Sequence, residues 1–224
     1  MAKVYFIFDW DWSAAAVEIQ KARQLDPLDG DAIRLAGVLA KSMGRLDEAS
    51  GLFQQAISLD PLSATNYVQL AEANADRGNY AAAELGFRKG VELAPPSGFG
   101  GRAALAELLL ATGKPAEALT SFEGLEDEDA RLWGRAMAYF ALGRKSDSER
   151  ALADLENRFA SDNAYSIALV HAYCGEIDQS FAWLDRAYAH KDLGLIVIKT
   201  DPFLQNLRGD PRYKLFLRKM NLLE

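Results

Sequence analysis

Cysteine is almost absent from the 224-residue chain, and this scarcity narrows its possible chemistry. The single Cys174 cannot form an internal disulfide, which fits a reducing compartment. No apolar run approaches the roughly 20 residues that cross a bilayer. The short apolar run at 4–8 is followed by Asp9 and Asp11, where a signal peptide would have its cleavage site. We therefore expect an uncleaved, soluble, cytoplasmic protein that has no membrane partner.

Histidine is also scarce, and basic residues do not predominate. The chain has 2 histidines, 25 basic residues and 32 acidic residues, with a net charge of −7. This balance argues against a nucleic-acid partner. His171 and Cys174 form half of a zinc spacing without a second half, so we expect His171 to be a packing histidine in the core or groove.

No arrangement typical of catalysis stands out in the sequence. No serine or cysteine nucleophile has a plausible histidine partner. The glycine-rich segment 98–105 lacks the preceding strand and the lysine of a phosphate-binding loop, which favours a flexible link between repeats. The acidic residues 126–129 favour a solvated loop and helix start over a calcium site. We predict a non-enzyme with no catalytic residues, no cofactor and no metal ion.

Internal repetition, by contrast, runs through most of the chain at a period of about 34 residues. The phased prolines are Pro27, Pro61 and Pro95, and the phased glycines are Gly44, Gly78, Gly113, Gly143 and Gly175. Each glycine lies between two apolar-periodic runs, as expected for a helix end with positive φ. After each glycine, a small, a large apolar and a small residue tend to share one helical stripe, as in Ala49, Phe53 and Ala56. The pattern predicts a series of antiparallel helix pairs.

This pattern resembles the tetratricopeptide repeat, whose second helix carries A-x3-F-x2-A between a turn glycine and a closing proline. The resemblance extends over residues 1–190 and loosens in the fifth unit, where Ser148 replaces the first alanine. It implies an all-α, right-handed superhelical solenoid of antiparallel helix pairs, followed by C-terminal capping helices at 191–224. The expected repeats are a truncated unit at 1–28 and units at 30–63, 64–97, 99–126, 129–160 and 161–190.

The first and last segments carry a second resemblance. "YFIFDWDW", "FAWLDRAY" and "DPFLQNLRGDPR" are similar to the C-terminal tetratricopeptide region of bacterial multidomain regulators, such as those with class III adenylate/guanylate cyclase domains. We expect none of those effector domains within residues 1–224. The resemblance implies the regulatory or sensory part of a larger bacterial signalling protein.

The two Asp-Pro pairs near the C-terminus predict two short helices. We expect the helices to cover the apolar face of the last repeat through Leu204, Leu207, Tyr213, Phe216, Leu217 and Met220. The apolar segment 193–198 is expected to be a helix or an extended link packed on that repeat.

The tetratricopeptide resemblance also implies a binding face, because the family usually binds peptides or helices on the concave side lined by its first helices. The residues carried over to that face are Arg34, Val38, Lys41, Glu72, Trp133, Met137, Phe140, Tyr165 and Tyr173. The late aromatic members favour an apolar peptide or helix. The competing interpretation is that these rings pack on the C-terminal cap or the next helix. We expect a protein or peptide partner, with a dimerisation scaffold for an attached effector domain as the alternative function.

The aromatic start of the chain fits the same phasing. Counted back from Pro27, Trp10 falls where the turn glycine belongs, and Asp11 falls at the N-cap of the next helix. Residues 3–8 are then expected to form a short, partly frayed helix.

Overall fold

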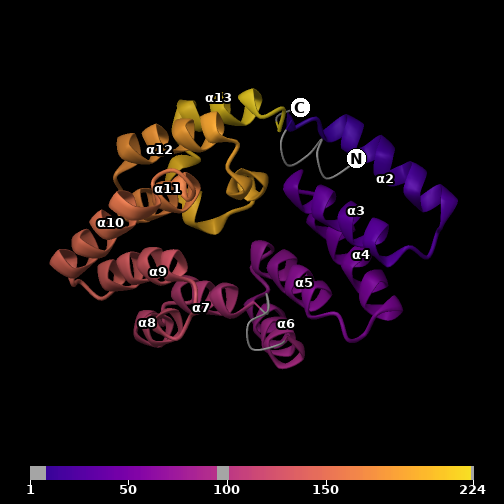
Figure 1. Cartoon of the computed structure of the whole chain (residues 1–224), viewed down its shortest axis with the longest axis horizontal. Helices are drawn as coiled ribbons and strands as arrows, with labels where there is room; N and C mark the ends of the chain where they lie inside the picture. Colours follow the sequence, from indigo (N-terminus) through magenta and orange to yellow (C-terminus); the bar gives the residue numbers. More distant parts are fainter. Residues whose placement is uncertain (1–8, 95–100, 223–224) are drawn as a thin grey trace. The chain divides into compact units, whose positions relative to one another are not determined.

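The computed structural model describes residues 9–94 and 101–222, and every regular element in these ranges is a helix (Figure 1). The chain divides into two compact units. Unit 1 contains the residues up to Gly101, residues 196–200 and the residues from Leu215 onward, and unit 2 contains Arg102–Leu195 and Asp201–Lys214.

The helices follow the predicted pairs. Unit 1 contains α2 (Trp12–Leu25), α3 (Gly30–Ser42), α4 (Leu46–Leu59), α5 (Ala64–Asp76) and α6 (Tyr80–Leu93). Unit 2 contains α7 (Arg102–Ala111), α8 (Pro115–Glu123), α9 (Glu128–Ala141), α10 (Lys145–Phe159), α11 (Ala164–Tyr173), α12 (Ile177–His190) and the 3₁₀ helix η3 (Pro202–Leu207). The 3₁₀ helix η2 (Leu193–Val197) and α13 (Pro211–Lys219) each contribute residues to both units.

The turns within the pairs have the backbone that the glycine spacing predicts. Gly44, Gly78, Gly113, Gly143 and Gly175 all have positive φ, between 72° and 82°. Trp10 takes the same place before α2 with φ 49°, and Asp11 caps α2 by accepting a hydrogen bond from the Ala14 amide at 2.9 Å. Both predictions for this turn are confirmed. The prediction for residues 3–8 lies outside the described residues.

Small residues face large ones both within a helix pair and between successive pairs. Phe53 is fully buried, and a Cβ added to Gly37 would lie 2.6 Å from its ring. In unit 2, a Cβ added to Gly134 would lie 2.2 Å from the ring of Phe122. Since ordinary van der Waals contact needs more than 3 Å, each glycine makes room for the ring of the neighbouring helix.

In α10 and α12, the second helices of the last two pairs, serine replaces the first alanine of the pattern for a structural reason. The Ser148 hydroxyl donates to the carbonyl of Ala136 at 2.7 Å, and the Ser180 hydroxyl donates to the carbonyl of Ala168 at 2.8 Å. Both serines are buried, so the hydroxyl keeps the small size of alanine and satisfies its polar atom. The loosened pattern of the fifth repeat therefore preserves the packing of the pair.

The C-terminal segment divides between the two units. Residues 201–214 lie in unit 2, where the Asn206 side chain donates to the Ala172 carbonyl at 3.0 Å. Residues 215–222 belong to unit 1, where the Trp12 indole N–H donates to the Met220 carbonyl at 2.7 Å. Of the six expected cap residues, Leu204, Leu207 and Tyr213 therefore lie in the same unit as the last repeat, and Phe216, Leu217 and Met220 lie in the unit of α2. The Trp12 indole provides a donor for a carbonyl just past the end of α13.

Two segments singled out in the sequence pack on each other within unit 2. The Arg212 guanidinium lies 4.4 Å from the centre of the Phe181 ring and forms an ion pair with Asp178 at 2.8 Å. "FAWLDRAY" and "DPFLQNLRGDPR" are thus joined by a cation–π contact, which gives these residue types a packing role.

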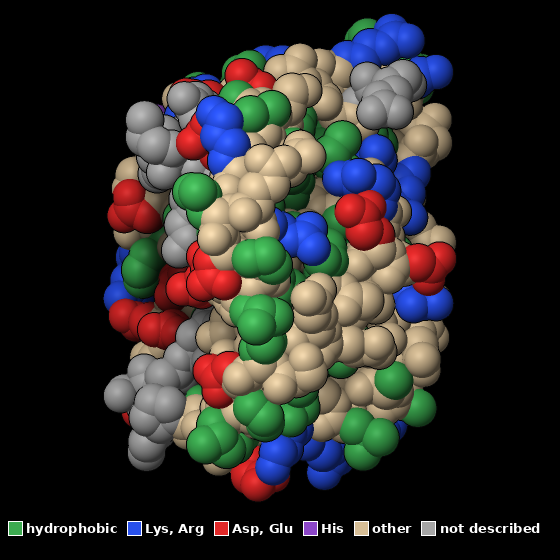
Figure 2. Space-filling model, turned by 90° about the vertical axis from the view of Figure 1, so that its right-hand side faces the viewer, with side chains coloured by type: hydrophobic (Ala, Val, Ile, Leu, Met, Phe, Trp, Pro, Cys, Tyr) green, Lys and Arg blue, Asp and Glu red, His purple; other side chains and the backbone are tan. Residues whose placement is uncertain are grey.

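Two surface properties bear on possible partners. None of the helices in the described ranges is long and apolar enough to span a membrane. On the face drawn in Figure 2, basic and acidic side chains are interspersed. That face offers no broad area of basic charge among its described residues, in keeping with the acidic composition.

The glycine at position 134 provides a matched stability test. Gly134→Ala is expected to lower the free energy of unfolding by about 2 kcal/mol, because overpacking costs roughly 1–3 kcal/mol and exceeds the helix-propensity gain. Gly51 in α4 has open space around it, so Gly51→Ala is expected to raise stability by about 0.5–1 kcal/mol. Urea denaturation measures both changes, and equal effects of the two substitutions would contradict the packing described for Phe122.

Candidate functional site

In unit 1, the residues predicted for the binding face come together across α3 and α5. The Lys41 ammonium forms an ion pair with the Glu72 carboxylate at 2.5 Å. The Lys41 side chain is only 5% exposed, so its charge is paired with Glu72 and is hardly accessible to a ligand. Arg34 pairs with Asp31 at 2.8 Å, and Val38 is half-buried. This polar face therefore has most of its charge neutralised internally.

In unit 2, the five predicted aromatic and methionine residues do not share one exposed surface. Trp133, Met137 and Tyr165 are buried, whereas Phe140 is 38% exposed and Tyr173 is half-buried. The Phe140 and Tyr173 rings meet edge to face, with centroids 6.0 Å apart. Burial leaves Phe140 and Tyr173 as the members of this set that a ligand can reach.

Tyr165 is covered by the segment that follows the last repeat. Its hydroxyl donates to Asp201 Oδ2 at 2.8 Å, and its backbone amide donates to Asp192 at 2.9 Å. A Cβ at Gly194 would lie 2.3 Å from the ring, so only glycine allows this approach. Burial first, and then the Asp201 charge, raise the pKa of Tyr165 well above its usual value. The tyrosine is therefore a neutral packing residue of unit 2.

The alternative in which the late rings pack on the C-terminal segment applies to Tyr173, through Phe203, a residue that the sequence analysis did not single out. Phe203 packs edge to face on Tyr173, with ring centroids 5.7 Å apart. Asp201 accepts a hydrogen bond from the Phe203 amide at 2.9 Å and so begins η3, as its Asp-Pro signal predicts. The signal located the helix start, and the expected packing of this helix on the last repeat did not name Phe203 as the contact residue.

The residues with possible chemistry have structural partners. His171 is buried, and its Nδ1 and Nε2 lie 2.6 Å and 2.9 Å from carboxylate oxygens of Glu176 and Glu156. Burial raises the pKa of the Cys174 thiol to about 11, so it is protonated near neutral pH and a weak nucleophile. The described residues contain no group of three or more side chains suited to hold a metal ion.

Comparison with known proteins adds to this geometry. Residues 34–61 match the family model of the tetratricopeptide repeat. The matched tetratricopeptide segment contains most of α3 and all of α4, which are the helices joined by Gly37 and Phe53. No match was found among curated proteins.

Several solved structures share the fold. The type IV pilus biogenesis factor PilW is 16% identical, with a TM-score of 0.64 over 92% of this chain and 94% of that one. YrrB, described as a tetratricopeptide-repeat protein with an unusual peptide-binding site, is 18% identical, with a TM-score of 0.50 over 90% and 97%. PilF of Pseudomonas aeruginosa is 15% identical, with a TM-score of 0.55 over 89% and 90%. These likenesses support an all-helical solenoid built from tetratricopeptide-type helix pairs.

Proposed function

We propose that this chain is a protein–protein interaction module that binds a peptide or helix on the face lined by its first helices. The observation that carries the proposal is the exposed Phe140 ring, which meets the Tyr173 ring edge to face. Aromatic residues are enriched at the energetic centres of interfaces because they bury a large area at low entropic cost. The fold shared with YrrB, for which a peptide-binding site is described, also supports it. No catalytic role is proposed for any residue.

Substitution of Phe140 tests this function. Helical peptides are first selected from a displayed random library against the intact chain. Their affinity for the Phe140→Ala variant is expected to be at least tenfold lower, as for the loss of an interface hot spot. Leu142 is the C-cap residue of α9, two positions after Phe140, and is also 38% exposed, so Leu142→Ala is the matched control. The proposed face would be contradicted if the peptides bound Phe140→Ala as tightly as the parent chain. It would also be contradicted if Leu142→Ala lowered their affinity as much as Phe140→Ala.

The finer proposal is a cytoplasmic, regulatory module of a bacterial cyclase-linked signalling protein. Its support is the similarity of "FAWLDRAY" and "DPFLQNLRGDPR" to such regulators. A second candidate, a dimerisation scaffold for an attached effector domain, is favoured by exposed leucines at the end of α2 and in the turns of unit 1. Leu25, Leu28 and Leu62 are 89%, 67% and 76% exposed. Sedimentation at high concentration separates the candidates, because a strict monomer argues against the scaffold.

A further inference from the structure

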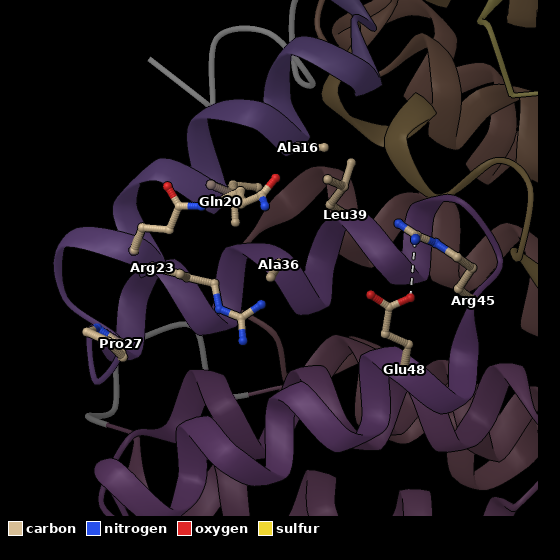
Figure 3. A pocket seen from close by; sticks show the side chains of 10 residues that line it. Ala16, Gln20, Arg23, Pro27, Ala36, Leu39, Arg45 and Glu48 are labelled. Carbon is tan, nitrogen blue, oxygen red and sulfur yellow. Dashed lines mark ion pairs between the residues drawn. The ribbon is translucent and has the colours of Figure 1, made fainter.

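A pocket of about 410 Å³ lies within unit 1, between α2 and the start of α4, with α3 as its floor (Figure 3). Gln20 and Arg23 line it from α2, Ala36 and Leu39 from α3, and Glu48 from α4. Gln20 and Arg23 are three residues apart and so lie on one helical face. The volume is within the range of about 300–1,000 Å³ that is typical of ligand sites.

This pocket is separate from the face lined by the first helices. Each residue of an α-helix turns by about 100°, so Ala36 and Leu39 lie roughly 200° and 140° around α3 from Arg34. The pocket residues of α3 are therefore on the side of the helix opposite to Arg34 and Lys41. A ligand here would not compete for the surface named under the proposed function.

Short side chains keep the pocket open. Ala36 lies on its floor, and Ala16 lines it from α2 (Figure 3). Leu39 is itself almost fully buried, so the floor is a close-packed apolar surface. An aliphatic side chain that entered the pocket would gain contact with this floor without displacing the core.

The charges around the pocket do not balance. Arg45 and Glu48 form an ion pair at 3.2 Å and neutralise each other. Within the described part of the chain, no carboxylate forms an ion pair with Arg23. In Figure 3 the Arg23 side chain runs from α2 toward the middle of the pocket, and its guanidinium ends below Ala36 without forming an ion pair with Glu48. The pocket therefore presents one uncompensated guanidinium beside an apolar floor.

We infer that this pocket binds a protein segment in which a carboxylate side chain stands next to an aliphatic side chain. Arg23 pairs with the carboxylate, because the planar guanidinium matches its two oxygens. The aliphatic side chain lies on Ala36 and Leu39, and the Gln20 amide contributes a further hydrogen-bonding group. One uncompensated cation in this pocket, on a chain of net charge −7, is too little for a nucleic acid, whose affinity comes from several phosphate contacts.

Nuclear magnetic resonance titration of the ¹⁵N-labelled full chain tests the inference. The probe is acetyl-Leu-Glu-Leu-amide, and its neutral match is acetyl-Leu-Gln-Leu-amide. We expect saturable shifts in α2, α3 and the start of α4, with at least tenfold weaker binding of the neutral peptide. Arg23→Gln is expected to lower the affinity for the acidic peptide at least tenfold. Lys21→Gln removes an exposed charge from the same helix and is expected to leave binding unchanged.

Four results would overturn the inference. They are no saturable shift at the pocket, equal affinity for the two peptides, equal losses in the two variants, or equal binding of inorganic phosphate at the same residues. Phe140→Ala serves to keep the two sites apart. It is expected to leave the pocket titration unchanged, so failure at either site is distinguishable from failure at the other.

Discussion

Phe53→Ala is expected to lower the free energy of unfolding of unit 1 by about 3–5 kcal/mol. The ring is fully buried against a cluster that includes Ala40, Ala49 and Ala73. These neighbours are already small, so they cannot close the cavity that the substitution leaves. Because repeat structures open locally, amide hydrogen exchange should accelerate in α3 and α4 more than in α9 and α11.

Gly37 supplies a sharper control for this prediction. In the parent chain, Gly37→Ala is destabilising because its Cβ meets the Phe53 ring at 2.6 Å. In the Phe53→Ala background the same Cβ enters the cavity, so its cost should fall by about 1 kcal/mol or more in a double-mutant cycle. Additive effects, or a loss below about 1.5 kcal/mol for Phe53→Ala alone, would show that Phe53 is not packed as described.

The repeat was predictable from sequence because it rests on local requirements. A turn that needs positive φ selects glycine, and the helix stripe selects small and large residues at fixed intervals. The same logic located Trp10, which adopts φ 49° in place of a glycine, with its side chain buried. An L-residue in this region costs about 1–2 kcal/mol, which burial of the indole can offset.

The binding face was less predictable, because exposure depends on contacts far apart in the sequence. Tyr165 occupies a repeat position that points inward, yet Asp192, Gly194 and Asp201 lie against it. These three residues come after the last repeat, so the repeat spacing gave no information on where they would pack. Trp133 is buried against Phe122 from the preceding helix, with ring centroids 5.0 Å apart. Whether a face is open thus depends on which neighbouring side chains are long enough to fill it.

The pocket beside Arg23 is a case in which the sequence did not predict an open space, whereas for Tyr165 it did not predict the covering residues. No motif points to it, since its residues are ordinary members of three amphipathic helices. It exists because two alanines leave space where a longer side chain would close it. Sequence patterns indicate which face of a helix is apolar, but not how completely the next helix covers that face.

Trp12→Ala is the second change from which we expect a large effect, a loss of about 3–5 kcal/mol in the stability of unit 1. The side chain is almost fully buried, and its indole N–H donates to the Met220 carbonyl across 208 positions of sequence. The Asn221 side chain also donates to the Trp10 carbonyl at 3.4 Å, and the Lys199 ammonium donates to the Leu222 carbonyl at 3.1 Å. Loss of the indole removes the most buried of these contacts.

Trp12→Phe separates the hydrogen bond from the packing. Phenylalanine keeps much of the buried ring but cannot donate, so the Met220 carbonyl loses its partner at a cost of about 1–3 kcal/mol. The amide of Leu222, which donates to the Leu217 carbonyl at 2.9 Å, reports on the end of α13. We expect its hydrogen exchange to accelerate in both variants, and more in Trp12→Ala. Unchanged exchange at Leu222 in both variants would mean that the end of α13 is held independently of the first helix, and that the assignment of residues 215–222 to unit 1 is wrong.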